Sequence, residues 1–563
     1  MEEEGRRVRP RTGFPRRRAV AACLTCREKK QKCNNERPSC STCEEMGIPC
    51  QYTKLDASSF DPASLRILEQ LTVIEALVRI MQAPSSLGEG PSSSNHTQLW
   101  QTLMAPPATC ESNSSNPDRI MISFSLDASF KAATDKLLQW PILERLLSSC
   151  QREDVEVLVD RFFKRVNNKN PILSRPTVAQ YCQSYYEDGP RFDLETCLVL
   201  LSCALAAVAM EYSPTGATSS AATPAESSSA RLEDLQLGYC YFAAAEKRLG
   251  PAMTEVSTLA IQCLCLAGIY HMFTLGPMHA SRMFHVAGSS LRILMSTNLN
   301  TPQETYQLYS KLFWACSNSE RELLAELPVN PPSLTGPGTP DAYPLPPRIE
   351  NIGRDEWSVQ EEDSWYFFLS EIALRRIADQ VSQVVAEHIS NRLNSDESPD
   401  IQELIPVVAE FEHQVHTFRE QLPLAMQFPD VPELSNTEWK QYTRGRFYRV
   451  LELMHRPFLF TALHDPNCGP VIRALAEKAL FNALKYLEHS HTSHRHHGTW
   501  LQLRNQLKET SLLLAASKVN GLTMPEGWEA GVSKSLSTFD YWLQEFPSCK
   551  TYTSIILTLA NGS

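Results

Sequence analysis

The sequence lacks a hydrophobic run long enough to cross a membrane. Its longest apolar stretch, residues 197–210, has fourteen residues, whereas a membrane-spanning helix needs about twenty. We read this stretch as a buried helix and expect no membrane partner. Residues 1–22 also lack the apolar segment of a secretory signal peptide, so we expect the cysteines to lie in a reducing compartment.

The sequence also lacks the common catalytic motifs. It contains no phosphate-binding P-loop, no G-x-S-x-G nucleophile elbow and no H-E-x-x-H zinc motif. We therefore predict that the chain is not an enzyme. An enzyme with a helical catalytic domain stays open only because the chain, at 563 residues, is long enough for two or three domains.

Positive charge is scarce overall and concentrated at one end. The chain has 53 Lys and Arg against 64 Asp and Glu, a net charge of −11. Residues 1–54 hold 13 basic and 7 acidic residues, which leaves +6 there and −17 on the rest. We expect the basic end to meet a polyanion, while the acidic remainder disfavours non-specific contact with nucleic acid.

Six of the seventeen cysteines lie close together near the amino terminus. The pattern C-x2-C-x6-C occurs twice, and the second copy follows the first after seventeen residues. The six are Cys23, Cys26, Cys33, Cys40, Cys43 and Cys50. Tetrahedral zinc takes four sulfur ligands at about 2.3 Å, so two zinc ions can share six sulfurs only if two of the sulfurs bridge both ions.

The repeat indicates which cysteines bridge. Cys23 and Cys40 lead the two copies and occupy equivalent positions, so we place both ions between them. The first ion then takes Cys26 and Cys33 as further ligands, and the second takes Cys43 and Cys50. A disulfide framework is the alternative, because six cysteines can pair in fifteen ways, but a reducing compartment disfavours it.

The two copies of the repeat differ in charge. The first encloses four basic residues and one acid, whereas the second encloses two acids and no base. The four basic residues are Arg27, Lys29, Lys30 and Lys32. A short helix from Cys26 to Lys32 would bring Arg27 and Lys30 onto one face. We therefore favour nucleic acid as the partner over a solvated charge run, and over a cysteine knot that binds only protein.

These residues resemble the fungal Zn2Cys6 binuclear-cluster transcription factors. The resemblance rests on Ala22-Cys23-x2-Cys26-Arg27-x-Lys29-Lys30-x-Lys32-Cys33 and Arg37-Pro38-x-Cys40-x2-Cys43-x6-Cys50. It implies two zinc ions and a helix in the DNA major groove, where Lys30 and Lys29 read the guanines of a CGG-like triplet. Arg27 and Lys32 would contact phosphates. It further implies a nuclear regulator of RNA polymerase II transcription, acting with the transcription machinery on a metabolic or biosynthetic pathway.

We assign the zinc module to residues 21–54. Residues 1–20, before it, are predicted to form a basic disordered arm, and residues 83–126 a flexible linker rich in Ser and Pro.

The segment between the zinc module and this linker, residues 60–82, carries apolar residues at a spacing of 4-3-4-3, namely Ile67, Leu71, Ile74, Val78 and Met81. This spacing predicts a short coiled coil that makes a homodimer. An amphipathic helix packed on the later domain is the alternative.

Residues 127–563 are predicted to form an all-helical domain, with a low-complexity insertion at 213–230. Strand signals are scarce. Helical patterns are visible at 155–166, 204–212, 232–249, 255–273, 279–294, 304–327, 360–390, 402–422, 437–463, 471–488 and 500–519. The predicted fold is therefore a small Zn2Cys6 cluster domain and a large all-α regulatory domain, joined by a short coiled coil and a disordered linker.

A second resemblance covers about residues 150–465. The segments that carry it resemble the fungal-specific transcription factor middle domain: 162–163 with 171–176, 312–314, 320–323, 328–333 and 455–459. The resemblance implies an all-helical regulatory domain. Residues 316–319, Cys-Ser-Asn-Ser, replace the hydrophobic residues usual there. A cavity in this domain is a possible site for a small-molecule effector.

A histidine tract lies further on, at His489, His491, His494, His496 and His497. Such a tract can bind a transition metal. Because no acidic or cysteine partner is fixed beside it, we interpret it as a solvated loop.

Overall fold

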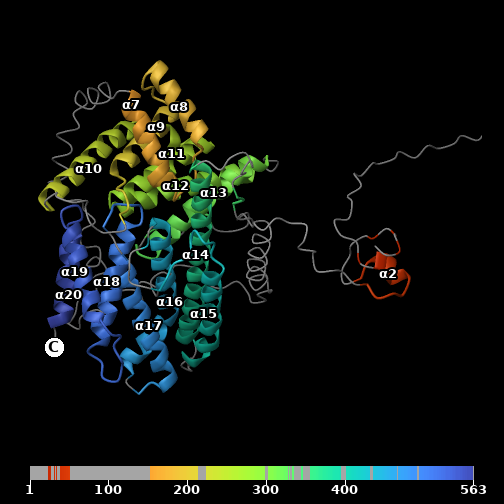
Figure 1. The fold of residues 1–563 in the computed structure, drawn as a ribbon, viewed down its shortest axis with the longest axis vertical. Helices are drawn as coiled ribbons and strands as arrows, with labels where there is room; N and C mark the ends of the chain where they lie inside the picture. Colours follow the sequence, from red (N-terminus) through yellow and green to blue (C-terminus); the bar gives the residue numbers. More distant parts are fainter. Residues whose placement is uncertain are drawn as a thin grey trace, which may run out of the picture. The chain divides into compact units, whose positions relative to one another are not determined.

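The computed structural model describes residues 23, 25–26, 29, 31, 33, 39–50, 152–213, 224–297, 302–327, 329, 332–334, 344–346, 356–394, 401–430, 435, 437–465, 467–490 and 493–561. The chain divides into two compact units, residues 1–90 and 91–563, and each is described by itself (Figure 1). The predictions for residues 1–20, 60–82 and 83–126 lie outside the described residues, as do the dimerisation residues Ile67 to Met81.

The described part of the second unit is built of helices and contains no strand, which confirms the all-α prediction. Its α-helices are α7 (Arg152–Phe162), α8 (Arg175–Asp188), α9 (Leu194–Val208), α10 (Pro224–Glu246), α11 (Thr258–Phe273), α12 (Pro277–Thr297), α13 (Gln303–Leu324), α14 (Glu356–Asn394), α15 (Leu404–Glu420), α16 (Glu438–His464), α17 (Pro470–His489), α18 (Thr499–Ala516), α19 (Trp528–Trp542) and α20 (Ser548–Asn561). A π-helical turn, η3 (Phe163–Asn167), continues α7. None of the described helices combines the length and hydropathy that crossing a bilayer requires.

The first hydrophobic core is formed by α7 to α13 together with α19, α20 and the start of α18. Helix α9 lies at its centre, and every one of its residues except Glu195 is buried, so the apolar stretch at 197–210 is a core helix as predicted. The Asp193 side chain caps α9 by accepting from the Thr196 N–H at 2.8 Å. Ser257 caps the equally apolar α11 through the Ala260 N–H.

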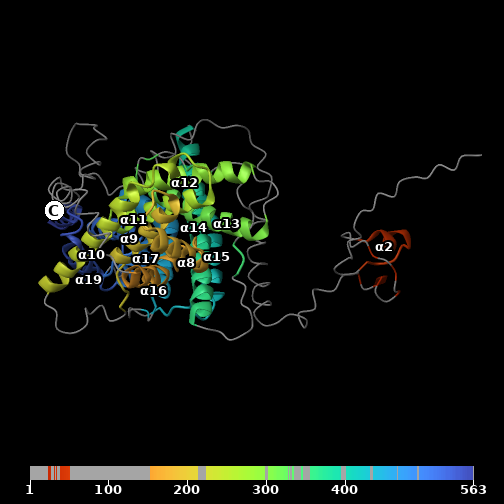
Figure 2. The ribbon, with the colours of Figure 1, turned by 90° about the horizontal axis from the view of Figure 1, so that it is seen from above.

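The second core is formed by α14 to α17 and the end of α18 (Figures 1 and 2). Helix α18 serves both cores, because Trp500 and Leu507 pack in the first and Leu513 in the second. Helix α13 contributes its apolar residues to the first core, while Glu322 on it forms an ion pair with Arg446 of α16. The two cores therefore meet across a layer of charged side chains.

The end of the low-complexity segment is helical. Helix α10 begins at Pro224 and so includes residues 224–230 of that segment. Proline suits the first turn of a helix because its missing N–H has no intrahelical partner there. Three helices were not predicted at all, namely α8, α19 and α20. In α19 the exposed face is rich in serine, a weak helix former, and burial of Phe539 and Trp542 supplies the stabilisation that the local sequence lacks.

Candidate metal centre and nucleic-acid interface

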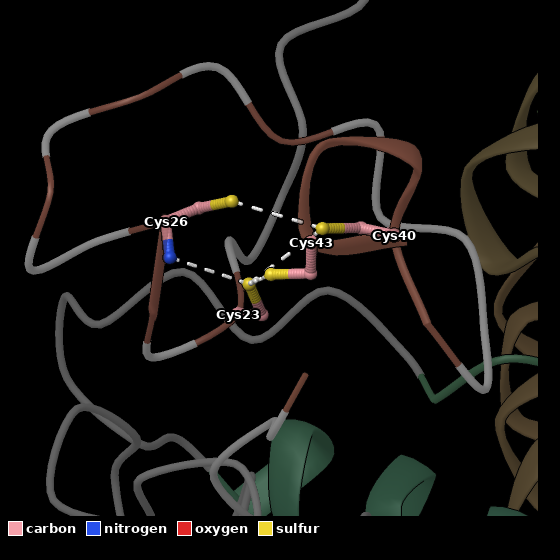
Figure 3. Close-up of side chains that lie close together, drawn as sticks. All are labelled: Cys23, Cys26, Cys40 and Cys43. Atoms are coloured by element: carbon pink, nitrogen blue, oxygen red, sulfur yellow. Dashed lines mark hydrogen bonds between the residues drawn. The ribbon is translucent and has the colours of Figure 1, made fainter. Parts of the chain in front are cut away.

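Four cysteine sulfurs of the first unit lie together (Figure 3). The Sγ atoms of Cys23, Cys26, Cys40 and Cys43 all lie within 4.8 Å of one another, and all four residues are buried. The Sγ–Sγ distance is 3.8 Å from Cys23 to Cys40, 3.6 Å from Cys23 to Cys43 and 3.7 Å from Cys26 to Cys40. These four cysteines are free thiols, and their separations are far longer than a disulfide bond of about 2.05 Å.

The separations are those of sulfurs on a shared metal. Two sulfurs each about 2.3 Å from one tetrahedral zinc lie about 3.8 Å apart. Each of the three measured distances joins two cysteines that the repeat assigns to the same ion. Cys23 and Cys40 each contact a cysteine from the other half of the repeat, as bridging ligands must.

The remaining two cysteines of the pattern adjoin this group. Cys33 is buried in the same cluster, and the half-buried Cys50 packs against it. The Cys40 N–H donates to the Cys50 sulfur at 3.3 Å, and the Cys26 N–H donates to the Cys23 sulfur at 3.4 Å. Backbone N–H groups that point at sulfur offset the negative charge of a thiolate. The described core of this unit consists of cysteine alone.

Local backbone geometry brings Cys50 back to the cluster. Helix α2 (Ser41–Glu45) starts directly after the extended Cys40, and it ends in a turn at Gly47. Gly47 has φ of +61°, a left-handed conformation that residues with a Cβ rarely adopt. The Ile48 N–H then donates to the Cys43 carbonyl at 3.0 Å. The chain is thereby reversed, and the last cysteine returns to the cluster.

The thiols of Cys26 and Cys43 are held in an environment that resists ionisation unless a cation is present. Burial and the neighbouring sulfurs raise the pKa of Cys43 to about 12, and they raise the pKa of Cys26 further. The hydrogen bond from the Cys40 N–H lowers the pKa of Cys50 to about 7. Zinc binds thiolate, so metal binding here must release protons, and acid must oppose it.

The basic segment between Cys26 and Cys33 is described only in part. Lys29 is exposed, and its N–H donates to the Thr25 carbonyl at 3.1 Å, one helical hydrogen bond of the predicted short helix. Arg27, Lys30 and Lys32 lie outside the described residues. Glu44 and Glu45 on α2 are also exposed, so Lys29 of the first half and both acids of the second half reach the surface.

Comparison with protein families gives two matches. Residues 21–58 match the fungal Zn(2)-Cys(6) binuclear cluster domain, and residues 159–324 match the fungal specific transcription factor domain. The chain is a fungal Zn(2)-Cys(6) transcription factor. The cluster domain of this family binds two zinc ions, and the cysteine geometry fits them, so the zinc prediction is confirmed.

Curated relatives agree with this family. A putative transcription factor of Aspergillus rugulosus, ecdB, is 23% identical over 438 residues, which cover 74% of this chain and 72% of that protein. The quinic acid utilization activator of Emericella nidulans is 32% identical over 104 residues, which cover 16% of this chain and 13% of that protein. Transcription factor FBD3 of Gibberella moniliformis is 43% identical over 51 residues, which cover 8% and 7%. The last two similarities are therefore local.

The signature residues of the middle domain link separate elements. Glu320 accepts from both the N–H and the hydroxyl of Ser333 and so fixes the proline-rich segment after α13. The next residue, Arg321, forms an ion pair with Asp379 of α14 at 2.7 Å. Residues 316–319, which depart from the resemblance, face the interior closely enough that the Cys316 sulfur lies 3.3 Å from that of Cys265. Small side chains permit this approach.

The histidine tract is not the solvated loop that the sequence suggested. His489, His494 and His496 are buried, whereas His491 lies outside the described residues. Nε2 of His494 donates to the Glu438 carboxylate at 2.9 Å, and the His494 ring packs against Tyr212. Among the described residues the four cysteines form the only group of three or more side chains placed to share a metal ion. His489, His494 and His496 are therefore interior residues, whereas His497 is half-buried.

Proposed function

We propose that the chain regulates RNA polymerase II transcription in the nucleus by binding CGG-like half-sites in double-stranded DNA. The four-sulfur group carries this proposal, because its geometry fits a shared metal ion and it includes Cys26, where the basic segment begins. Transcription factors of this family are generally nuclear. The comparisons do not favour a cysteine knot that binds only protein, and they give no support to an enzyme.

The proposal includes a ligand set for each ion. One zinc is held by Cys23, Cys26, Cys33 and Cys40, and the other by Cys40, Cys43, Cys50 and Cys23. The three sulfur separations of 3.6–3.8 Å support this arrangement.

The proposal also assigns the basic residues. Lys30, with Lys29 beside it, reads the O6 and N7 acceptors of guanine, while Arg27 and Lys32 hold phosphates. Exposure of Lys29 beside the sulfur cluster supports this assignment. Two chains pair through residues 60–82, with Ile67, Leu71, Ile74, Val78 and Met81 at the contact, and the pairing sets the spacing of two half-sites.

The experiment is a DNA-binding titration with the full-length protein. The probes are a duplex with two CGG triplets and a duplex in which both triplets are replaced. We expect Lys30→Ala to reduce discrimination between the duplexes by about 1–3 kcal/mol. Arg27→Ala should weaken binding to both and lower the slope of log affinity against log salt by about one. Lys550→Ala, at an exposed lysine of α20, is the control. Unchanged discrimination in Lys30→Ala would refute the base-reading role.

Chelation tests the same proposal from the metal side. Removal of zinc should abolish specific binding, because such small modules fold only with their metal, and added zinc should restore it. The relatives' names, a quinic acid utilization activator among them, support control of a metabolic pathway as the biological role. Binding that survives full removal of zinc would contradict the proposal.

A further inference from the structure

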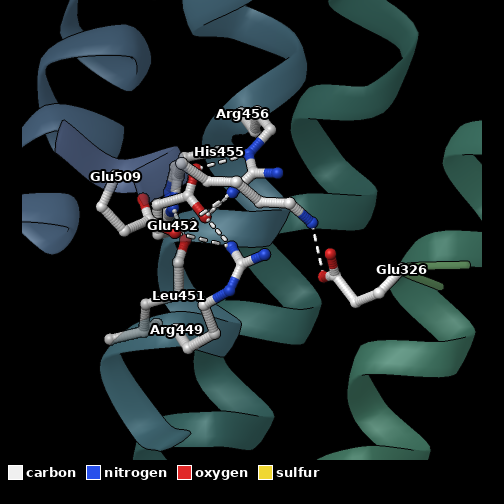
Figure 4. A network of polar contacts seen from close by, with 8 residues as sticks. Glu326, Arg449, Leu451, Glu452, His455, Arg456 and Glu509 are labelled. Atoms are coloured by element: carbon white, nitrogen blue, oxygen red, sulfur yellow. Dashed lines mark hydrogen bonds and ion pairs between the residues drawn. The ribbon is translucent and has the colours of Figure 1, made fainter. Parts of the chain in front are cut away.

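A cavity of about 160 Å³ lies between the two cores of the helical unit. Its walls come from α13 and α18, which serve the first core, and from α14, α16 and α17 of the second. Residues Glu326 and Arg449, seen in Figure 4, are part of this wall. Small-molecule sites favour such positions between packed bodies, where groups from several elements converge.

Helix α16 keeps this space open with a glycine. Gly445 lies in the middle of α16 and lines the cavity. A Cβ built there would meet only the Ser490 hydroxyl oxygen, at 3.8 Å, an ordinary contact. Glycine destabilises a helix interior relative to alanine, and neighbouring protein atoms give no reason for it here. The missing side chain leaves room for something that is not part of the chain.

One buried side chain in the wall lacks hydrogen-bond partners. The His489 side chain is fully buried and stacks on Tyr448 with 5.0 Å between ring centroids, yet neither ring nitrogen has a partner. A buried imidazole holds one N–H donor and one acceptor, and leaving both unpaired is unfavourable. A polar molecule inside the cavity would meet this need.

The hydrogen-bond donors left without partners around the cavity favour a ligand that accepts hydrogen bonds. The five cationic side chains of the wall are each ion-paired with a carboxylate: Arg321 with Asp379, Arg375 and Arg446 with Glu322, Arg449 with Glu452, and Lys508 with Glu326. Nε of Arg375 is buried without a hydrogen-bond partner. Burial, followed by the positive charges of Arg444, Lys485 and Lys534, lowers the pKa of His489 to about 3, and only Asp430 opposes it. The field at the imidazole is therefore positive.

We propose that this cavity binds a small organic carboxylate, with His489 and Arg375 as its hydrogen-bond donors and Gly445 as the floor. A cavity of this volume has room for a small ligand such as a short-chain acid. The ligand would bridge α13, α14, α16 and α17 and so change how the two cores are held together. The binding site stands on its own geometry. Its meaning as an effector site rests on the proposed function.

The test is a binding titration on the full-length, zinc-loaded protein. Sodium acetate, lactate, succinate and citrate are each added at an ionic strength held constant with sodium chloride. Affinity is measured by calorimetry and the melting temperature by scanning fluorimetry. We expect at least one acid to bind and to raise the melting temperature above that in sodium chloride alone. Gly445→Leu, which fills the cavity, should weaken binding about tenfold or more.

Two further variants keep the test decisive. Gly445→Ala should fold at least as well as the wild type and weaken binding partially, which covers the case in which Gly445→Leu does not fold. Gly250→Leu, at an exposed glycine with no neighbouring atoms within 4 Å of a Cβ, should bind like the wild type. If none of the four acids binds, the cavity holds only water and the proposal is wrong. If the Gly445 and Gly250 variants bind the acids equally well, the acids bind outside this cavity, and the proposal is also wrong.

Specific DNA binding is measured in parallel on the same samples. Loss of DNA recognition with intact carboxylate binding would refute the proposed function and leave this site standing. Intact DNA recognition without carboxylate binding would refute this site and leave the proposed function standing.

Discussion

The ammonium group of Lys169 donates to both carboxylate oxygens of Glu438, at 2.6 and 2.7 Å, although 269 residues separate them in the sequence. Lys169 follows η3, beside the first core, and Glu438 is the first residue of α16 in the second core. A carboxylate at a helix N-terminus also interacts favourably with the helix dipole. The pair therefore joins the two cores at one end of their charged boundary.

We expect Lys169→Met to lower the free energy of unfolding by about 3 kcal/mol, because it leaves Glu438 buried without its main partner. Burial alone would raise the pKa of Glu438, but Lys169 and His494 hold it well below its usual value. Glu438→Gln should be similarly destabilising, and the double variant should lose less than the sum of the two. Urea unfolding, monitored by circular dichroism, measures the free energy of unfolding of each variant. Lys478→Ala, at a half-exposed pair with Glu412, should cost less than about 1 kcal/mol.

Two neighbouring buried carboxylates should respond differently to loss of charge (Figure 4). Glu452 accepts from Arg456 at 2.6 Å and pairs with Arg449, and these arginines keep its pKa below the usual value despite burial. Burial and the charge of Glu452 raise the pKa of Glu509 to about 7. We expect Glu452→Gln to lower the free energy of unfolding by about 3 kcal/mol or more.

Glu509→Gln should change the free energy of unfolding by only about 1 kcal/mol at neutral pH, since Glu509 is already partly protonated there. The same unfolding assay compares the two variants at pH 7. Equal losses would contradict the assigned ionisation states.

The stability of the helical unit should fall as the pH falls from 7 to 5. The Gly498 N–H donates to Nδ1 of His496, so this nitrogen must stay unprotonated in the folded state. Burial, together with His494, lowers the pKa of His496 well below 6.5. Below pH 6.5 the unfolded chain therefore binds a proton that the folded chain does not, and stability is lost at up to about 1.4 kcal/mol per pH unit.

His496→Gln should make the melting temperature less sensitive to pH between 7 and 5, whatever its value at pH 7. His464→Gln is the control, because that ring lies on the exposed end of α16. Parallel pH profiles for the wild type and His496→Gln would show that another group controls the acid response.

The zinc content should depend on which cysteine is removed. Cys40→Ser removes a sulfur that we propose bridges the two ions, and it should reduce zinc from two ions per chain to fewer than one. Cys468→Ser, in the helical unit, should leave two. Elemental analysis by mass spectrometry measures the ratio. A Cys40→Ser protein that retains two ions would contradict the bridging role.

The sequence predicted the metal module better than the arrangement of the helices. Six cysteines at fixed spacing restrict the chemistry to a shared-metal cluster, and the geometry of Cys23, Cys26, Cys40 and Cys43 agrees with it. Helices α9 and α11 were also predictable, because their apolar stretches exclude other interpretations. Helix α19 was missed because long-range burial of Trp542 outweighs its weak local preference.

The charged boundary between the cores could not be predicted. His489 and His496 stand in a polar, histidine-rich tract, which in isolation is typical of a surface loop. They are buried because α16, α17 and α18 close around them, and partners such as Glu438 come from distant parts of the chain. A single sequence offers no period or spacing that connects such residues.

Because the described core of the first unit consists of cysteine alone, the fold of this unit depends on the supply of zinc. A chain depleted of zinc would keep its helical half, whose cores contain no such sulfur group among the described residues, while its DNA-reading end lost shape. The cell's metal supply then sets how many intact copies can find a promoter, independently of how many have been synthesised.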